Sequence, residues 1–367
     1  MIEISYEDLR TLGLTPSIAQ QMALHQCATS QQGEARRRWF RITAVHRETL
    51  AVHDGQAPVS ARCMASLARE CFESGSALAV GDWVVGVADD YGQVWVHERM
   101  APLTQIVRRD ADGSRHVVVS NVDTSLLVMG LDLDFNLQRM ERYLALVQGC
   151  GVLPVVVLTK SDIARQAGAY VLEQRVESVR ARLGNGVDVH ALDARDPKAA
   201  TGLEAYLGVG QTLVLLGSSG AGKSTLTNAL AGMALQDTGA VREHDSRGKH
   251  TTTSRALHRL AGGACVIDTP GVRTLRPDVG AHAMGQVFSD IARLAQDCRF
   301  RDCAHGDEPG CAVRAAVDPQ RLRNFHKLLR ELRRDAMSVL ERQQQLSEWK
   351  ARGRAGRQRQ EAKWQIP

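Results

Sequence analysis

The sequence predicts an α/β protein with a small β-barrel, a mostly parallel sheet and a small helical domain, in that order along the chain. Short β-like runs separated by turns fill residues 37–110. Apolar strands then alternate with helical stretches over residues 115–278. A cluster of cysteines and one histidine follows within residues 279–350. Buried strands that alternate with helices indicate a parallel sheet covered on both faces.

The N-terminal part is predicted from its local patterns. Residues 1–36 form a leader, with a helix over Ser5–His25 and a polar linker. The runs Trp39–Val45 and Trp83–Val87, with turns such as Gly81-Asp82, are typical of a small barrel resembling an OB-fold. Such barrels often bind oligonucleotides, but barrel shape alone does not establish a function.

The predicted sheet rests on continuous apolar runs. Asp123–Leu131, Leu153–Leu158 and Thr212–Leu216 have the composition of strands buried on both faces. Helical periodicity over Leu137–Gly149 and a polar helix over Ala169–Leu183 separate them. Together they predict one α/β domain.

Composition and charge narrow the class of protein. Hydrophobic content of 44% and charged content of 24% are ordinary for a soluble globular chain. No signal sequence or membrane-spanning run is found, so we expect a cytoplasmic protein, a monomer, with no membrane partner. From residue 320 to the end there are 13 Lys or Arg against 5 Asp or Glu, and residues 351–367 are predicted to be disordered. This basic tail fits either a polyanionic partner or a solvated, salt-bridged helix.

A phosphate-binding loop follows the third apolar strand. The segment reads Gly217-Ser218-Ser219-Gly220-Ala221-Gly222-Lys223-Ser224-Thr225 and opens a helix. Its glycines let backbone N–H groups point at phosphate, and the helix N-terminus favours an anion. Lys223 is predicted to reach the β- and γ-phosphates as a catalytic cation, and Ser224 to ligate Mg²⁺.

A second phosphate-site motif is Asp268-Thr269-Pro270-Gly271, after the apolar run Ala264–Ile267. We expect Asp268 to hold the Mg²⁺ shell and the Gly271 N–H to contact the γ-phosphate. The polar stretch between the two motifs is predicted to be a switch-like loop, in which Thr251 or Thr252 completes the Mg²⁺ shell. A plain hydroxyl-rich loop is the alternative.

Guanine recognition is predicted from Thr159-Lys160-Ser161-Asp162, which resembles the Asn-Lys-x-Asp motif of GTPases. There the aspartate accepts two hydrogen bonds from guanine, a donor pair that adenine lacks. The lysine stem packs over the base. Thr159 departs from the usual asparagine. The usual Ser-Ala pair would fall at His190-Ala191, where the Ala191 N–H is expected to meet the guanine oxygen.

The order of these motifs is unusual. Guanine recognition precedes the phosphate loop, which precedes Asp268, whereas ordinary GTPases have the phosphate loop first. The sequence therefore predicts a circularly permuted P-loop GTPase domain. The γ-phosphate-sensing segment then leads directly into the C-terminal domain, so we expect the nucleotide state to move that domain.

A metal site is predicted from Cys298, Cys303, His305 and Cys311. Three thiolates and one imidazole complete a tetrahedral set for Zn²⁺ with no open position for catalysis. We therefore expect one structural zinc ion per chain. Reduced cysteines that are neighbours by chance are the alternative.

These features together resemble the ribosome small-subunit-dependent GTPase family, RsgA or YjeQ. The resemblance covers residues 37–330 and rests on the permuted motifs, Gly-Lys-His-Thr-Thr-Thr at 248–253, and Cys-x4-Cys-x-His-x5-Cys. It implies an OB-fold, a permuted GTPase domain, a zinc domain, and binding of ribosomal RNA late in small-subunit assembly. It also implies faster GTP hydrolysis on that subunit. Thr159, His190 and the leader depart from the family and suggest a divergent or second copy.

The hydrolytic group is not obvious. Val272 follows Gly271, where many GTPases place a water-orienting glutamine, so slow intrinsic turnover is expected. His250 is our catalytic candidate, and an exposed loop histidine without such a role is the alternative. With the family in view, a helical stripe for RNA phosphates is predicted from Arg323, Lys327, Arg330, Arg333 and Arg334.

Three other functions compete with a ribosome-assembly GTPase. The first is a GTP-regulated RNA- or protein-binding switch, in which hydrolysis only resets the state. A small-molecule kinase would use the same phosphate loop, but Asp162 and the zinc set argue against it. An ATPase is disfavoured by Asp162 as well.

Overall fold

The computed structural model describes residues 5–29, 37–110, 114–183, 186–196, 198–232, 255–269, 276–277 and 281–336. The chain divides into two compact units, Met1–Val287 and Phe288–Pro367. Barrel and parallel sheet belong to the first unit, and the cysteine cluster belongs to the second. The division falls later in the chain than the predicted boundary at 278. Each unit is described separately below.

The leader consists of two helices, α1 (Tyr6–Arg10) and α2 (Pro16–Thr29), where the sequence predicted one. The chain turns between them at Gly13, whose φ is +86°. A Cβ there would lie 1.9 Å from Nη1 of Arg41, so only glycine fits this turn. The leader is part of the barrel core, because its apolar side chains pack with those of β1 and β4: Leu9, Leu12, Leu14, Ile18, Met22, Trp39, Trp83 and Val85.

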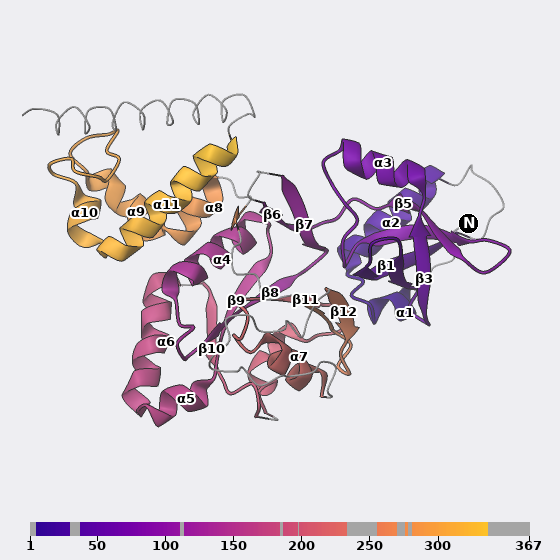
Figure 1. Cartoon of the computed structure of the whole chain (residues 1–367), viewed down its shortest axis with the longest axis horizontal. Coiled ribbons are helices and arrows are strands. Elements are labelled where there is room, and N and C mark those ends of the chain that lie inside the picture. Colours follow the sequence, from indigo (N-terminus) through magenta and orange to yellow (C-terminus); the bar gives the residue numbers. More distant parts are fainter. Residues whose placement is uncertain are drawn as a thin grey trace, which may run out of the picture. The chain divides into compact units, whose positions relative to one another are not determined.

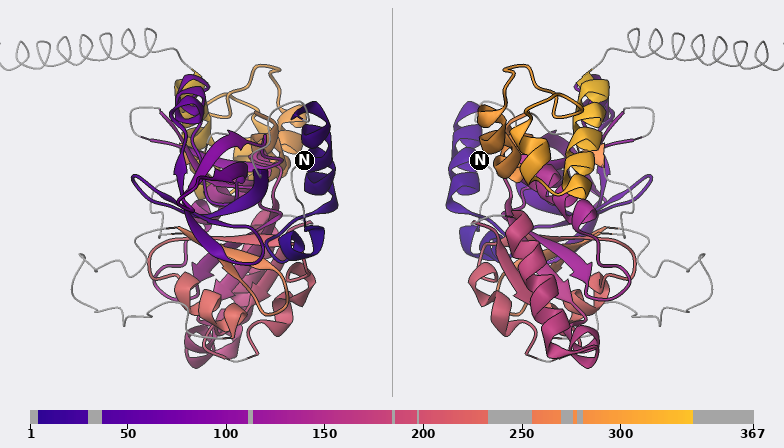
Figure 2. Two further views of the ribbon diagram at one scale, coloured as in Figure 1. Left: turned by 90° about the vertical axis from the view of Figure 1, so that its right-hand side faces the viewer. Right: turned by 90° about the vertical axis from the view of Figure 1, so that its left-hand side faces the viewer.

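The barrel is closed by five strands, β1 (Arg37–Val45), β2 (Leu50–His53), β3 (Pro58–Cys63), β4 (Trp83–Ala88) and β5 (Val94–Arg99). They pair in the order β1-β2-β3-β5-β4, and β4 pairs back to β1. Helix α3 (Ala65–Glu73) joins β3 to β4. The predicted barrel is confirmed. Figure 2 shows α1 and α2, in indigo, beside it.

A short hairpin links the barrel to the next sheet. It comprises β6 (Gln105–Arg109) and β7 (Arg115–Ser120), and β14 (Arg276–Pro277) pairs with β6. The sequence did not predict these strands, because the basic ends of β6 and β7 mask their apolar centres.

The central sheet has the order β10-β9-β8-β11-β13-β12. Its strands are β8 (Thr124–Gly130), β9 (Leu153–Thr159), β10 (Asp188–Ala191), β11 (Thr212–Leu216), β12 (Ala256–Arg259) and β13 (Cys265–Asp268). All pairings are parallel except that of β12 with β13. The carboxyl ends of the five parallel strands therefore meet at one edge. The circularly permuted α/β fold predicted from the motif order is confirmed.

Helices cover both faces of this sheet. Helices α4 (Leu137–Gly149) and α6 (Ala169–Leu183) lie on one side and α7 (Lys223–Ala231) on the other (Figure 1). Three short helices complete the unit: α5 (Ser161–Gln166), η1 (Thr201–Tyr206) and α8 (Ala281–Val287).

Two of the contacts that join barrel and sheet involve β1. Strand β1 pairs with the edge strand β12, with Ala44 opposite Ala256. Arg41 is fully buried and donates hydrogen bonds to the Leu12 carbonyl, to Thr212 Oγ1 at 2.8 Å and to the Asn121 carbonyl at 2.8 Å. Burial lowers the pKa of this guanidinium, and the acceptors compensate its lost hydration. Arg41 thus fastens leader, barrel and β11 together.

The second unit is helical. It contains α9 (Ser289–Leu294), η2 (Ala295–Asp297), α10 (Ala312–Ala316) and α11 (Pro319–Ala336). The rings of Phe288 and Phe325 lie 5.2 Å apart, and Arg321 pairs with Asp290 at 2.7 Å. The long helix predicted to reach Trp349 is described as far as Ala336. Within the described ranges, no helix has the length and apolar character needed to cross a bilayer.

Candidate nucleotide site and metal centre

The phosphate loop connects the end of β11 to α7, which begins at Lys223. Two of its glycines could not be replaced by a larger residue without strain. A Cβ at Gly217 would lie 2.3 Å from the Val128 carbonyl oxygen, and Gly222 has a φ of +92°. The loop is therefore tightly wrapped beside β8, as a backbone cradle for phosphate requires.

Lys223 is only 6% exposed and lies within this loop. Its Nζ donates to the carbonyl oxygens of Gly217, at 3.1 Å, and Ser218, at 2.8 Å. Burial lowers the pKa of its ammonium, while the carboxylates of Asp268 and Asp134 act in the opposite direction. A phosphate oxygen is a stronger acceptor for this cation than two carbonyls are.

Asp134 contacts the same loop, and sequence reasoning missed it. The Ser218 hydroxyl donates to the Asp134 carboxylate, which also pairs with Arg139 at 2.6 Å. Asp134 follows β8 just before α4. The available signal was its position, since polar residues after a buried parallel strand lie at the binding edge.

Two of the residues expected to hold Mg²⁺, Asp268 and Ser224, lie at this edge of the sheet. Asp268 ends β13, is 1% exposed and lies opposite Leu215 of β11. Ser224 lies in the first turn of α7. A carboxylate and a hydroxyl are oxygen donors of the kind that Mg²⁺ prefers. Four predicted site residues lie outside the described residues: His250, Thr251, Thr252 and Gly271.

Thr159 joins the guanine motif to the phosphate loop. It is fully buried at the end of β9, and its Oγ1 donates to the Ala221 carbonyl oxygen at 2.6 Å. The threonine that replaces the usual asparagine therefore still contacts the backbone of the loop.

Lys160 takes the left-handed conformation, with φ of +59°. Its Nζ donates to Asp132 Oδ2 at 2.6 Å. Burial raises the pKa of Asp132, but the hydrogen bond and charge of Lys160, together with the backbone N–H of Asp134, outweigh burial and leave the pKa lowered. The lysine is thus anchored to the loop that follows β8.

Asp162 offers two differently placed oxygens in the first turn of α5. Oδ1 is buried and has no hydrogen-bond partner. Oδ2 accepts from Nη2 of Arg195, which follows β10. The carboxylate therefore retains one buried acceptor that guanine can use.

The segment in contact with the guanine motif is Leu192–Arg195, directly after the predicted fifth element at His190-Ala191. The Leu192 carbonyl accepts from the Ser161 N–H at 3.3 Å. Ala191 lies within the sheet opposite Leu158, and the His190 ring packs against Tyr206 at 6.1 Å. The available signal was the Asp-Ala pair at 193–194, which follows the end of the strand. Contact of Ala191 with guanine stays a prediction.

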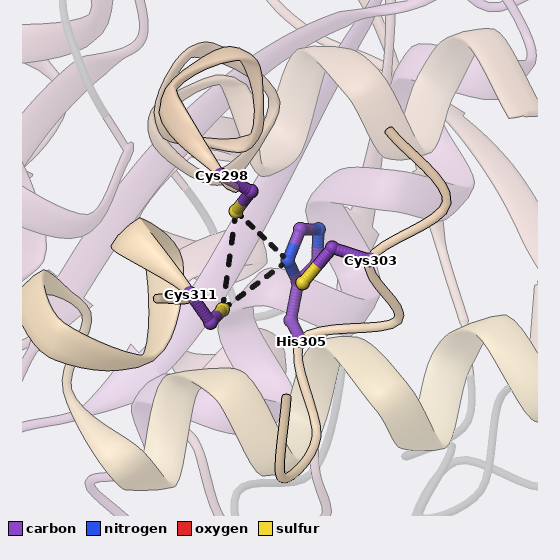
Figure 3. Close-up of side chains that lie close together, drawn as sticks. All are labelled: Cys298, Cys303, His305 and Cys311. Carbon is purple, nitrogen blue, oxygen red and sulfur yellow. Dashed lines mark hydrogen bonds between the residues drawn. The ribbon is translucent and has the colours of Figure 1, made fainter. Parts of the chain in front are cut away.

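The four predicted metal ligands come together. Their ligand atoms all lie within 4.8 Å of one another, and Figure 3 shows the side chains turned toward each other. The sulfurs of Cys298 and Cys311 are 3.9 Å apart, and each is 3.6 Å from Nδ1 of His305. The edges of a zinc tetrahedron with sulfur ligands are about 3.8 Å long, so the set fits a tetrahedral metal.

Hydrogen-bond donors favour the thiolate form of Cys298 and Cys311, whereas burial and the neighbouring cysteines raise the pKa of the Cys303 thiol to about 11. The Val313 N–H, foremost among several groups, lowers the pKa of the Cys298 thiol. The Arg314 N–H donates to Cys311 Sγ at 3.3 Å. Glu308 accepts from the backbone of Ala304 and Gly306, which fixes the loop carrying His305. Donors aimed at sulfur are the support that a thiolate ligand needs.

The family of this chain follows from its similarity to two proteins of Xanthomonas. Two proteins named "Small ribosomal subunit biogenesis GTPase RsgA", from Xanthomonas axonopodis pv. citri and Xanthomonas oryzae pv. oryzae, are each 43% identical to this chain over 324 residues. The match covers 86% of this chain and 86% of each relative. The chain belongs to the RsgA GTPase family. The RsgA GTPase family profile matches residues 97–277.

Solved structures agree in fold. YjeQ from Thermotoga maritima matches with a TM-score of 0.56 at 21% identity, over 81% of this chain and 98% of that protein. YloQ, described as a circularly permuted GTPase, matches with a TM-score of 0.55 at 22% identity, over 82% and 96%. As a member of the RsgA GTPase family, the chain is a GTP hydrolase.

Proposed function

We propose that this GTPase binds the small ribosomal subunit, assists its late maturation and is stimulated by that subunit. The observation that carries the proposal is the Thr159–Ala221 contact, which joins a guanine motif to a phosphate loop at one sheet edge. The names of the Xanthomonas relatives supply the partner. The proposal puts the protein in the cytoplasm, acting as a monomer.

Each site residue has a role in nucleotide binding. Asp162 accepts hydrogen bonds from guanine, and Lys160 covers the base. When the nucleotide binds, the Lys223 ammonium exchanges its two carbonyl acceptors for oxygens of the β- and γ-phosphates. The backbone N–H groups of the loop, as far as Thr225, surround the phosphates. Ser224 and Asp268 hold Mg²⁺, with Thr251 or Thr252, and Gly271 contacts the γ-phosphate. When bound, Mg²⁺ neutralises negative charge on the phosphates.

Hydrolysis needs a group that orients water. The apolar Val272 cannot do so, and we propose His250 or a group of the partner for this role. A site that lacks one orienting group turns over slowly until the partner supplies it. Stimulation by the subunit follows from this gap.

The metal cluster is structural in this proposal. Zinc is the metal that three thiolates and one imidazole select, and four protein ligands leave no position for water. In the described part of the unit from Phe288, only a few apolar side chains are buried, Phe288 and Leu328 among them, so the metal would stabilise its fold.

The RNA contact is proposed on α11. All five predicted basic side chains are exposed, and four recur at helical spacing on one face: Arg323, Lys327, Arg330 and Arg334. Arg321 instead faces inward to Asp290. Exposed cations along one helix face suit a phosphate backbone.

The test is GTP hydrolysis by the purified protein with isolated small subunits, large subunits or neither. We expect strong stimulation by small subunits alone. Equal rates in all three, with GTP still bound, would contradict the ribosomal role and leave the GTPase assignment intact. RNA binding without stimulation would favour the alternative, a GTP-regulated RNA-binding switch.

A further inference from the structure

The carboxylate proposed to recognise guanine forms an ion pair with an arginine in the structure. Asp162 Oδ2 accepts from Arg195 Nη2, while Oδ1 is buried with no hydrogen-bond partner. The Asp162 side chain is 23% exposed and that of Arg195 is 67% exposed. The ion pair therefore lies at the solvent side of the predicted base site.

Arg195 is shared between two carboxylates. Its Nε lies 3.3 Å from Asp193 Oδ1, and its Nη2 lies 3.5 Å from Asp193 Oδ2. The Arg195 backbone N–H also donates to Asp193 Oδ1 at 3.0 Å, which fixes the loop. The guanidinium thus has a second partner within reach of its present position.

Guanine would bind the Asp162 carboxylate, one oxygen of which already accepts a hydrogen bond from Arg195. Its N1–H and exocyclic amine donate side by side to both oxygens of one carboxylate. A guanidinium presents a similar pair of parallel donors to a carboxylate. The base and Arg195 therefore compete for Asp162.

We propose that Arg195 is a resident counter-ion of Asp162, which guanine displaces onto Asp193 as the nucleotide binds. The inference rests on the proposed role of Asp162. It makes Arg195 a residue that sets the rate of nucleotide association. Without this cation, Asp162 and Asp193 would lose the guanidinium that pairs with both carboxylates.

The expected change in the association rate is small, because solvent reaches the Arg195–Asp162 ion pair. Ion pairs that solvent reaches are weak, so removing the guanidinium should speed association only about two- to fivefold. We expect Arg195→Ala to raise the association rate of a fluorescent GDP analogue by this factor in stopped-flow measurements at low salt. Dissociation should be unchanged. The difference should shrink in roughly 1 M salt, where screening acts within about 3 Å.

A substitution of Asp193 should change the association rate in the opposite direction. Asp193→Asn keeps an oxygen for the Arg195 backbone N–H but removes the charge that receives the displaced guanidinium. Association should then be slower than in the wild type. A merely structural role for this loop would not move the two variants in opposite directions. Arg180→Ala, which removes an exposed arginine on α6, is the matched control and should leave both rates unchanged.

Two results would overturn the inference. Faster dissociation from Arg195→Ala would mean that the guanidinium holds the bound base. Unchanged rates would mean that the ion pair does not affect binding.

Asp162→Asn separates this inference from the proposed base contact. That variant should lose affinity for GDP and gain it for xanthosine diphosphate, whose ring carries an oxygen in place of the amine. In that background, Arg195→Ala should not change association of xanthosine diphosphate. If Asp162→Asn binds GDP like the wild type, the base contact fails and the inference fails with it. If only the Arg195 variants behave like the wild type, the counter-ion role alone fails.

Discussion

The Thr159 hydroxyl donates to the Ala221 carbonyl oxygen at 2.6 Å, and both residues are fully buried. This bond joins the strand end that carries the guanine motif to the loop expected to hold phosphate. A Cβ at Gly222 would lie 3.2 Å from the same hydroxyl, so the contact is close on both sides. It gives a physical reason why threonine is accepted where asparagine is usual.

Replacing Thr159 by valine should uncouple the two halves of the site. The shape is kept, but the buried Ala221 carbonyl loses its donor, at a cost of about 1–2 kcal/mol. We expect GDP affinity to fall about tenfold and the midpoint of chemical unfolding to decrease. Thr159→Ser keeps the hydroxyl and should behave nearly like the wild type in fluorescent GDP titration. Equal affinities for the valine and serine variants would rule out this coupling.

Removing the Lys223 ammonium should abolish most hydrolysis. A preorganised cation at the phosphates is worth roughly 100- to 1,000-fold in rate. Lys223→Ala should therefore lose that factor in subunit-stimulated kcat, measured by phosphate release. Lys198→Ala removes an exposed lysine and serves as the control. A stimulated rate within a few-fold of the wild type would exclude Lys223 from the chemistry.

Removing the metal should unfold the second unit and spare nucleotide binding. Cys311→Ala, or a chelator, takes away one ligand or the ion, and the helices from Ser289 lose the centre that joins them. We expect faster hydrogen exchange over residues 288–336 and unchanged GDP affinity. Cys150→Ala is the matched control in the first unit. Zinc content near one per chain should drop only in the Cys311 variant.

The exposed face of α11 should determine the salt dependence of RNA binding. Neutralising Lys327 and Arg330 together removes two phosphate contacts, so the slope of log affinity against log salt should decrease by about 1.4–1.8. The same pair of changes at Arg180 and Lys198 controls for net charge. An unchanged slope in small-subunit binding would place the RNA contact elsewhere.

Lowering the pH should decrease the stability of the first unit, because His53 becomes protonated. Burial, reinforced by Arg259, lowers the pKa of His53, and its unprotonated Nδ1 accepts from the Gly55 N–H at 3.0 Å. The unfolded chain therefore takes up this proton first. Stability is complete above the ordinary value of 6.5 and decreases as the pH falls below it, by at most about 1.4 kcal/mol per pH unit.

His53→Asn keeps an acceptor that cannot be protonated in this range. Its unfolding free energy should change less with pH below 6.5 than that of the wild type. His97→Asn, at an exposed position of β5, should leave the pH profile unchanged. Identical profiles for all three proteins would show that His53 does not contribute.

The sequence by itself determined the parts of this protein whose chemistry is local. The phosphate loop, Asp162 and the four metal ligands each lie within a short segment, and each segment carries its own residue types and spacing. The order of those segments also determined the permuted topology. Local patterns failed where basic ends mask the apolar centre of a strand, as in β6 and β7, or where a turn at a crowded glycine divides a helical stretch, as at Gly13.

Only the tertiary structure decided which distant residues meet. Ser218 and Asp134 are 84 positions apart, and Arg195 and Asp162 are 33 apart, yet each pair is in contact. Arg41 reaches Thr212 across 171 positions. For the first two pairs, the reason is that parallel strands from separate parts of the chain end at one sheet edge. Side chains there become neighbours through strand order, which no short segment of sequence contains.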